Sequence, residues 1–272
     1  MKACYSLQNI THMNKTKIIT GLIFTFLILS LNVKSQVNQY DEQGRKHGEW
    51  EVKNNYGQIK YKGQFNHGTP VGKFIHYYRY RKLKTEAFYR DSAKIVRVKE
   101  YYKNGKLQAE GKYVKKERDS TWVYYNPQGM RVKKEYYNEG TPDSLWYIYY
   151  GDSGEVSEVQ EYDDGEKHGV WKQFFDDGTV KLMAHYEDGK MHGKYRVNHP
   201  SGKLYKTGEY KNGFRDGLWI VKDEEGNIVK KVRYEQGHEK VIMNKLEKEE
   251  EAKEGEIDEP KTPFNRNRRP RE

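Results

Sequence analysis

The sequence predicts an all-β protein, an elongated repeat array of about eight 24-residue antiparallel β-hairpins that form a single twisted sheet. Three observations predict it. An aromatic residue returns at a nearly constant interval, glycines return at fixed places between the aromatics, and the intervening segments alternate polar and apolar side chains. A constant period of this length is typical of repeat arrays. Alternation on both sides of a glycine-containing turn is typical of β-hairpins.

The aromatic residue that opens each unit defines the period. Successive openers are 24 residues apart, and once 25, because the loop 150–154 has one extra residue. Val98 fills the place between two of these aromatics. The openers are Trp50, Phe74, Trp122, Trp146, Trp171, Tyr195 and Trp219.

Glycines mark the turn inside each hairpin. A turn such as the one at 176–179 needs a residue with positive φ, which glycine adopts without strain. These glycines follow the opener by seven residues and include Gly178, Gly202 and Gly226. We therefore treat them, with the openers, as the structural residues of the repeat.

The second strand of each hairpin predicts one packed face. The residues 9, 13 and 15 positions after the opener share a face, because side chains alternate along a strand. The first is aliphatic, the middle one is usually small, and the last is aromatic. We expect the small residue, as at Gly111 or Gly208, to make room for a neighbouring ring. Glu135 and Gln160 interrupt this column, and the alternate positions predict a solvated second face.

Residues 1–35 are interpreted as a signal peptide. Lys15 and Lys17 precede an apolar run over residues 18–33, and the run is short for a membrane span. The alternative is an uncleaved anchor, and Met13 is an alternative start. We therefore expect export to the periplasm, the cell surface or the medium.

Composition narrows the class of protein further. The 272 residues include 24 Tyr and 25 Gly, 33% are charged, and the mean hydropathy is −1.14. A chain this polar cannot fill a large closed core, whereas in an array each hairpin covers only its neighbours. The formal net charge is +10, but acids are interspersed with the bases, which argues against a nucleic-acid partner. Cys4 is the one cysteine and precedes the apolar run, so no disulfide is expected.

The repeat domain is predicted over residues 36–238, followed by a charged tail over residues 239–272. A short helix is expected from Lys240 to Lys248, and mixed charge with proline predicts disorder beyond it. The alternative function for the basic end, Arg266 to Arg271, is a contact with an anionic surface such as a membrane.

The units resemble MORN repeats, in particular the bacterial variant with the pattern Gly-x-Trp-x-x-Tyr/Phe-x-x-x-Gly, followed by an aromatic residue and Asn/Asp-Gly. The resemblance covers about Tyr40 to Gly237 and is weakest over residues 74–116, where Arg81, Ser92 and Val96 replace glycines. It implies the hairpin fold. Some bacterial members carry an antitoxin label, and better-known MORN proteins act as scaffolds or have been linked to lipids.

One column contains the residue types of metal ligands. It holds His47, His168 and His192, with Asp119, Asp143 and Asp216 in other units. Equivalent residues of consecutive hairpins lie about 10 Å apart, too far for one ion. Since His and Asp also tolerate turn conformations, we interpret the column as structural and expect no metal and no cofactor.

A second column predicts a ligand site. Its members follow the opener by three residues, opposite the opener's face, where an exposed aromatic ladder would bind a glycan or an extended peptide. The alternative is a structural role, in which the rings shield their own sheet. The residues are Tyr77, Tyr101, Tyr125, Tyr149 and Phe174.

No catalytic motif accompanies the repeats, so we predict a non-enzymatic protein. The expected function is a protein-binding or scaffolding surface in the cell envelope. The alternatives are a polysaccharide- or peptidoglycan-binding module that uses the aromatic column, and an antitoxin-like partner of a toxin. Because stability in an array sums local units and their neighbours, units two and three, which lose glycines, are expected to open before units six to eight.

Overall fold

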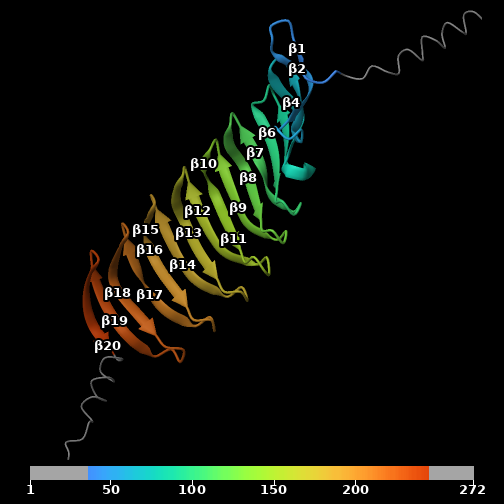
Figure 1. Ribbon diagram of the computed structural model, residues 1–272. Coiled ribbons are helices and arrows are strands. Elements are labelled where there is room, and N and C mark those ends of the chain that lie inside the picture. The colour runs from blue at the N-terminus through green and yellow to red at the C-terminus, as the bar shows by residue number, and fades with distance from the viewer. Residues whose placement is uncertain (1–35, 245–272) are drawn as a thin grey trace, which may run out of the picture.

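The computed structural model describes residues 36–244, which form one continuous antiparallel sheet of 20 strands (Figure 1). The predicted all-β hairpin array is confirmed. The proposed signal peptide and the chain beyond residue 244 lie outside the described residues and stay predictions. Within residues 36–244, no helix is long and apolar enough to cross a membrane.

Eight hairpins correspond to the eight predicted units. They are β2 (Lys46–Lys53) with β3 (Ile59–Asn66), β4 (Thr69–Tyr77) with β5 (Leu83–Arg90), β6 (Ile95–Tyr101) with β7 (Leu107–Val114), β8 (Glu117–Tyr125) with β9 (Arg131–Asn138), β10 and β11 (Thr141–Pro142, Ser144–Tyr149) with β12 (Val156–Asp163), β13 (Glu166–Phe174) with β14 (Val180–Glu187), β15 and β16 (Lys190–Met191, Gly193–Asn198) with β17 (Leu204–Lys211), and β18 (Phe214–Lys222) with β19 (Ile228–Glu235). The short β1 (Gln39–Tyr40) pairs with β2, and a 3-10 turn, η1 (Arg79–Arg81), lies between β4 and β5.

The C-terminal end of the sheet differs from the expectation. The helix predicted from Lys240 is wrong over the residues described, because β20 (His238–Asn244) pairs antiparallel with β19. The free edge of β19 offers unpaired backbone groups, and a further strand satisfies them. The strand has the place of the first strand of a ninth unit, so the sheet runs past the expected boundary at residue 238.

One face of the sheet, which we call the ring face, carries the openers. The ring of Trp122 lies on Gly111 of the preceding hairpin, where a Cβ atom would overlap the indole, and Gly208 bears the same relation to Trp219. Both tryptophans are only 2% exposed. The predicted role of the small column is thereby confirmed at these junctions.

A cation covers several of these rings from outside. The guanidinium of Arg118 lies 5.0 Å from the Trp122 ring centroid, and that of Arg215 lies 4.9 Å from Trp219. Such cation–π contacts shield a ring while the charge stays in water. A single sheet can therefore bury its aromatic side chains without a second layer.

Both edges of the ribbon tie neighbouring hairpins together. At one edge, two-residue turns with positive φ at both residues join most of the hairpins, as at Asp164 and Gly165 (φ 45° and 89°), whereas the longer turn 91–94 joins β5 and β6. The Gly165 amide donates to the Pro142 carbonyl of the preceding unit. At the other edge, the Tyr102 hydroxyl donates to the Tyr125 carbonyl of the next unit.

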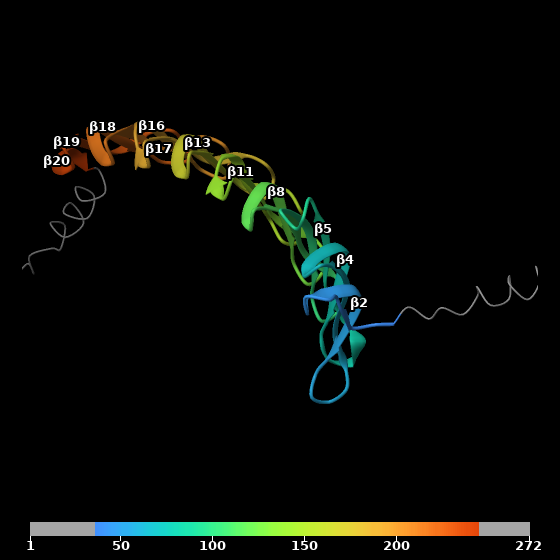
Figure 2. The same cartoon turned by 90° about the horizontal axis from the view of Figure 1, so that it is seen from above.

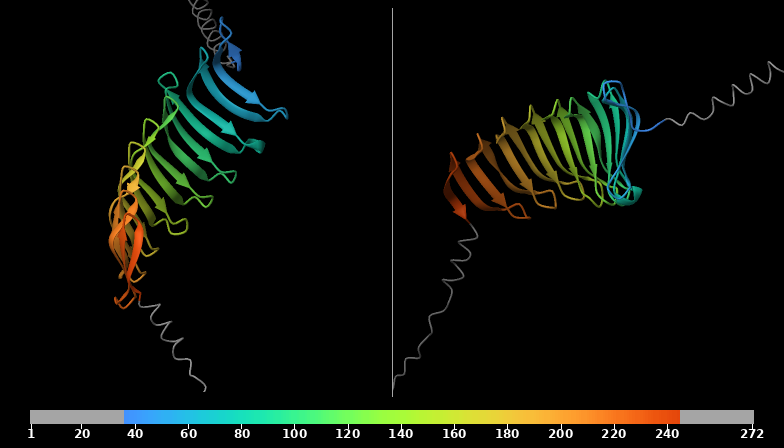
Figure 3. Two further views of the ribbon diagram at one scale, coloured as in Figure 1. Left: turned by 90° about the vertical axis from the view of Figure 1, so that its left-hand side faces the viewer. Right: turned by 45° about the horizontal axis from the view of Figure 1, so that its top comes forward.

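The ribbon is twisted and curved. The strand direction turns steadily from the first hairpin to the last, and the view from above shows the ribbon as an arc (Figures 2 and 3). A right-handed strand twist has this effect over many strands. Each of the eight hairpins also has a register shift near its turn, as between Val52 and Lys53, and such bulges add twist.

Candidate binding groove

The face opposite the rings, which we call the groove face, contains a groove of about 700 Å³ that crosses β4 to β8. Its floor is the backbone of the second to fourth hairpins. Its lining includes the side chains of Lys73, Glu86, Phe88, Arg97, Lys99, Glu110, Lys112 and Val123. The groove overlaps residues 74–116, where other residues replace several of the repeat glycines.

A missing bulge marks the centre of the groove. The β5–β6 pair keeps a continuous register, from Thr85 opposite Glu100 to Arg90 opposite Ile95. Val96 accounts for this, because the equivalent glycines have φ of 64° at Gly72 and at Gly169, which a β-branched residue resists. Between the other described hairpins, the register shifts or a strand is interrupted.

Four groove side chains form a row across successive strands. Lys73 is opposite Phe88, Phe88 is opposite Arg97, and Arg97 is opposite Lys112. Directly opposite residues of an antiparallel pair have Cβ atoms about 5 Å apart. The row therefore places Lys73 and Arg97 on either side of Phe88, with Lys112 beyond Arg97.

Two glutamates of the groove are held by neighbours on both sides. Glu86 accepts a hydrogen bond from the Tyr101 hydroxyl at 3.0 Å and pairs with Lys73 at 2.5 Å. In the next unit, Glu110 accepts from the Tyr125 hydroxyl at 2.8 Å and lies 3.4 Å from the ammonium of Lys99. The Lys73 hydrogen bond is the main cause of a lowered pKa at Glu86.

The same contacts decide the exposure of the predicted aromatic column. Tyr77, Tyr101, Tyr125 and Phe174 are half-buried, and Tyr149 is 8% exposed beneath the Arg131 guanidinium. The expectation that this column is exposed is therefore wrong. Burial first, and then the nearby carboxylates, raise the pKa of Tyr101 and of Tyr125 to about 12. These two tyrosines hold groove glutamates in place.

The structural residues of the repeat lie on the ring face and in the turns. Trp50 and Phe74 are buried with Trp122 and Trp219, whereas Trp146, Trp171 and Tyr195 are half-buried. The turn glycines Gly178, Gly202 and Gly226 have φ of 83°, 80° and 93°.

The His and Asp column does not form a metal-binding group anywhere in residues 36–244. Asp119 pairs with Lys112 at 2.5 Å, and His192 lies 3.3 Å from the Glu187 carboxylate. These members are thus engaged with side chains of their own hairpin or its neighbour.

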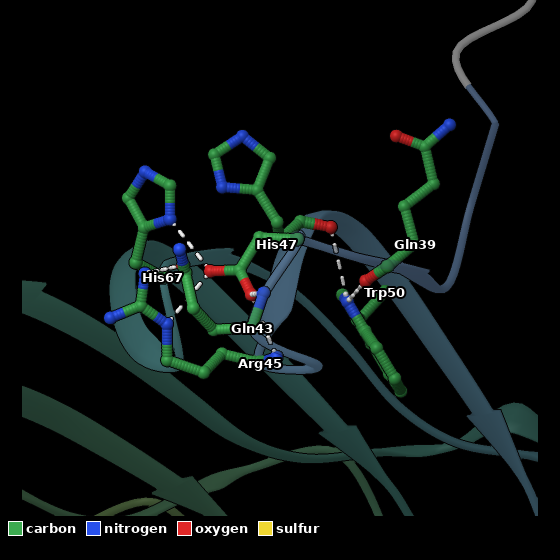
Figure 4. A network of polar contacts seen from close by, with 7 residues as sticks. Gln39, Gln43, Arg45, His47, Trp50 and His67 are labelled. Carbon is green, nitrogen blue, oxygen red and sulfur yellow. Dashed lines mark hydrogen bonds and ion pairs between the residues drawn. The ribbon is translucent and has the colours of Figure 1, made fainter.

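At the N-terminal edge, His47 lies beside a polar cap (Figure 4). The His67 Nδ1 and the Arg45 Nε lie 2.7 Å and 2.8 Å from the Asp41 carboxylate, and the His47 ring lies 4.7 Å from that of His67. Burial alone would raise the pKa of Asp41, but hydrogen bonds from His67 and Arg45 hold it well below its usual range. The cap closes the first turn.

The family comparison agrees with this architecture. The model of the MORN repeat variant matches residues 96–115, 167–188 and 191–212. The chain contains MORN variant repeats. MORN repeats are generally protein- or membrane-binding modules. No curated protein matches the chain.

The first matched MORN repeat, residues 96–115, contributes Arg97, Lys99, Glu110 and Lys112 to the groove. Sequence reasoning missed these residues as a group, because it sought ligand contacts in an aromatic column. The available signal was Val96, a β-branched residue in a column that otherwise holds glycine or serine.

Proposed function

We propose that this MORN repeat protein is an exported, non-enzymatic scaffold of the cell envelope, and that its groove face binds another protein. The observation that carries the proposal is the 700 Å³ groove across β4 to β8. The groove lies on the face opposite Trp122 and Trp219, whose rings are covered by their own cations.

The remaining support comes from the sequence. The apolar run after Lys17 has the charge and length of a signal peptide. Repeat sheets provide long, regular surfaces of the kind used for binding other macromolecules. The half-buried tyrosines leave the polysaccharide hypothesis without the exposed column on which it rested.

A pair of tryptophan substitutions tests the groove. Thr121 and Leu218 occupy the same column, one residue before an opener, but only Thr121 lines the groove. We expect a protein that co-purifies with the tagged full chain from envelope extracts to be lost with Thr121→Trp and retained with Leu218→Trp.

Three results would contradict the proposal. They are capture that is equal for both variants, capture of purified cell-wall polymer instead of protein, and retention of the chain in the cytoplasm together with a toxic protein. The last result would favour the antitoxin alternative.

A further inference from the structure

The chemistry of the groove indicates which kind of segment it takes, an inference that rests on the proposed function. Within residues 36–244, Lys73, Lys99 and Lys112 each have a carboxylate partner, whereas Arg97 has none. Arg97 is exposed and lines the groove. The uncommitted charge in the groove is therefore a guanidinium, which binds carboxylates through two parallel hydrogen bonds.

An aromatic surface lies next to this guanidinium. Phe88 is directly opposite Arg97 in the β5–β6 pair and is 40% exposed. The Arg90 guanidinium lies 5.1 Å from the Phe88 ring centroid and adds positive charge on the same strand. Val123 adds an aliphatic wall on β8. An anionic group and an apolar group can thus be bound side by side.

The two glutamates restrict the class of anion. Glu86 and Glu110 lie in the same groove as fixed negative charges. A polymer with a phosphate on every unit would meet these carboxylates as well as the guanidinium. A peptide can instead place one carboxylate at Arg97 and neutral or apolar side chains elsewhere.

We propose that the groove binds an extended peptide segment in which an acidic residue and an apolar residue stand two positions apart. The carboxylate bonds to the Arg97 guanidinium, and the apolar side chain packs on Phe88. In an extended peptide, residues two apart project from the same face about 7 Å from each other. This spacing fits Arg97 and Phe88, because their strands lie about 5 Å apart and their side chains extend beyond the backbone.

Labelled peptides test this directly. The probes are a fluorescein-labelled octapeptide in which Glu and Phe alternate at every second position with Ser between them, called the Glu–Phe peptide, and its matched Gln–Phe octapeptide, titrated with the purified full chain by fluorescence anisotropy. We expect the Glu–Phe peptide to bind about tenfold more tightly, the difference for one charge-assisted hydrogen-bond pair. Equal binding of the two peptides would overturn the proposal.

Two arginine variants locate the contact. Arg97→Gln should weaken the Glu–Phe peptide about tenfold and leave the Gln–Phe peptide unchanged, while Phe88→Ala should weaken both. Arg233→Gln is the matched control, because Arg233 is exposed on the same face in the eighth hairpin. Equal loss with Arg97→Gln and Arg233→Gln would place the contact elsewhere. Because Arg97 forms no ion pair in the described sheet, Arg97→Gln should have the same Tm as the wild type.

The envelope pull-down separates this inference from the proposed function. Loss of the natural partner with Arg97→Gln, as with Thr121→Trp, supports both. Retention with Arg97→Gln and loss with Thr121→Trp leaves the groove as the binding surface but overturns the acidic-peptide inference. Retention with both variants overturns both.

Discussion

The opening tryptophan packs differently at two neighbouring junctions between hairpins. Between the third and fourth hairpins, Gly111 lies beneath Trp122, and the indole is 2% exposed. At the next junction Glu135 has the place of the glycine, and Trp146 is half-buried. One residue on the preceding strand therefore decides whether the tryptophan lies flat on the sheet.

Glu135 replaces the missing ring contact with a polar cluster. It is 4% exposed, accepts a hydrogen bond from the Tyr137 hydroxyl at 2.8 Å and pairs with Lys133 at 2.5 Å. A buried carboxylate is stable only with such partners. The junction therefore depends on charge where its neighbour depends on shape.

Gln160 causes a different rearrangement one unit later. Its amide donates to the Glu161 carbonyl at 2.9 Å. In other units the equivalent carbonyl accepts from the next indole, as the Glu209 carbonyl does from Trp219. Trp171 donates instead to the Glu158 carboxylate at 3.0 Å. A competing donor thus redirects the ring.

The largest expected effect concerns a glycine beneath a ring. Gly111→Ala places a Cβ atom inside the Trp122 indole, and such overpacking lowers the free energy of unfolding by about 2–3 kcal/mol. Gly151→Ala is the control, because Gly151 lacks a positive φ and its nearest neighbour would be 3.5 Å away. Urea unfolding checks both. Equal losses would show that ring seating does not stabilise the junction.

The second prediction concerns acid. Burial alone would raise the pKa of Glu135, but hydrogen bonds with Lys133 and Tyr137 lower it below its ordinary value of 4.5. A lowered carboxylate pKa stabilises the fold above the unfolded value, and this contribution is lost as the pH falls through the folded value. We expect Glu135→Gln to cost about 1–3 kcal/mol at neutral pH.

Unfolding as a function of pH distinguishes a charge effect from a packing effect. The difference between the wild type and Glu135→Gln should shrink as the pH falls below 4.5, the ordinary pKa of a Glu carboxyl group. The exposed Glu225 offers a control, since Glu225→Gln should change little. A difference that stays constant as the pH falls would mean that the side chain's shape matters, and not its charge.

Much of this molecule could be predicted from sequence, because the repeat itself carries the information. The opener period and the alternation along each strand predict which residues lie on the ring face. The small residues of the column at Gly111 and Gly208 predict where the rings pack. The groove could not be predicted in this way. It depends on the absence of a bulge at Val96 and on which cations keep a carboxylate partner, and both are relations between strands.

The prediction that the aromatic column is exposed was wrong for a related reason. Parity places Tyr101 and Tyr125 on the groove face, as the structure has them. Parity does not show that Glu86 and Glu110 of the preceding hairpins accept hydrogen bonds from their hydroxyls. A side chain that reaches across to the next strand is buried by its partner.

The third prediction tests the ties along the edge of the sheet. The Tyr102 and Tyr150 hydroxyls donate to the Tyr125 and Phe174 carbonyls of the following units, at 2.8 Å and 2.7 Å. Tyr102→Phe and Tyr150→Phe should each cost about 1 kcal/mol and speed hydrogen exchange in the adjoining turns. Tyr56→Phe should have no effect, since Tyr56 is 78% exposed. Unchanged exchange in the tyrosine variants would show that the ties do not couple the units.

The smallest effect comes from turn conformation. Arg81 has a φ of 58°, a left-handed conformation that costs a residue with a side chain about 1 kcal/mol. Arg81→Gly removes that strain, but a glycine also increases the entropy of the unfolded chain, so we expect a net gain of about 0.5 kcal/mol. Gly178→Ala should have the opposite sign, because Gly178 has a φ of 83° and no neighbour within 4 Å of the added Cβ atom.

Hydrogen exchange then decides between two rankings of the units. Glycine content predicts that residues 74–113 open before residues 171–234. Ring burial favours the reverse order for the sixth unit, because Phe74 and Val98 belong to one buried cluster with Trp122, whereas Trp171 is half-buried. The eighth unit is an exception, because Trp219 is buried with Val232 and Tyr234. Slower exchange in residues 74–113 would show that seated rings outweigh turn strain. It would also make the groove the rigid part of the sheet, as a preformed binding site requires.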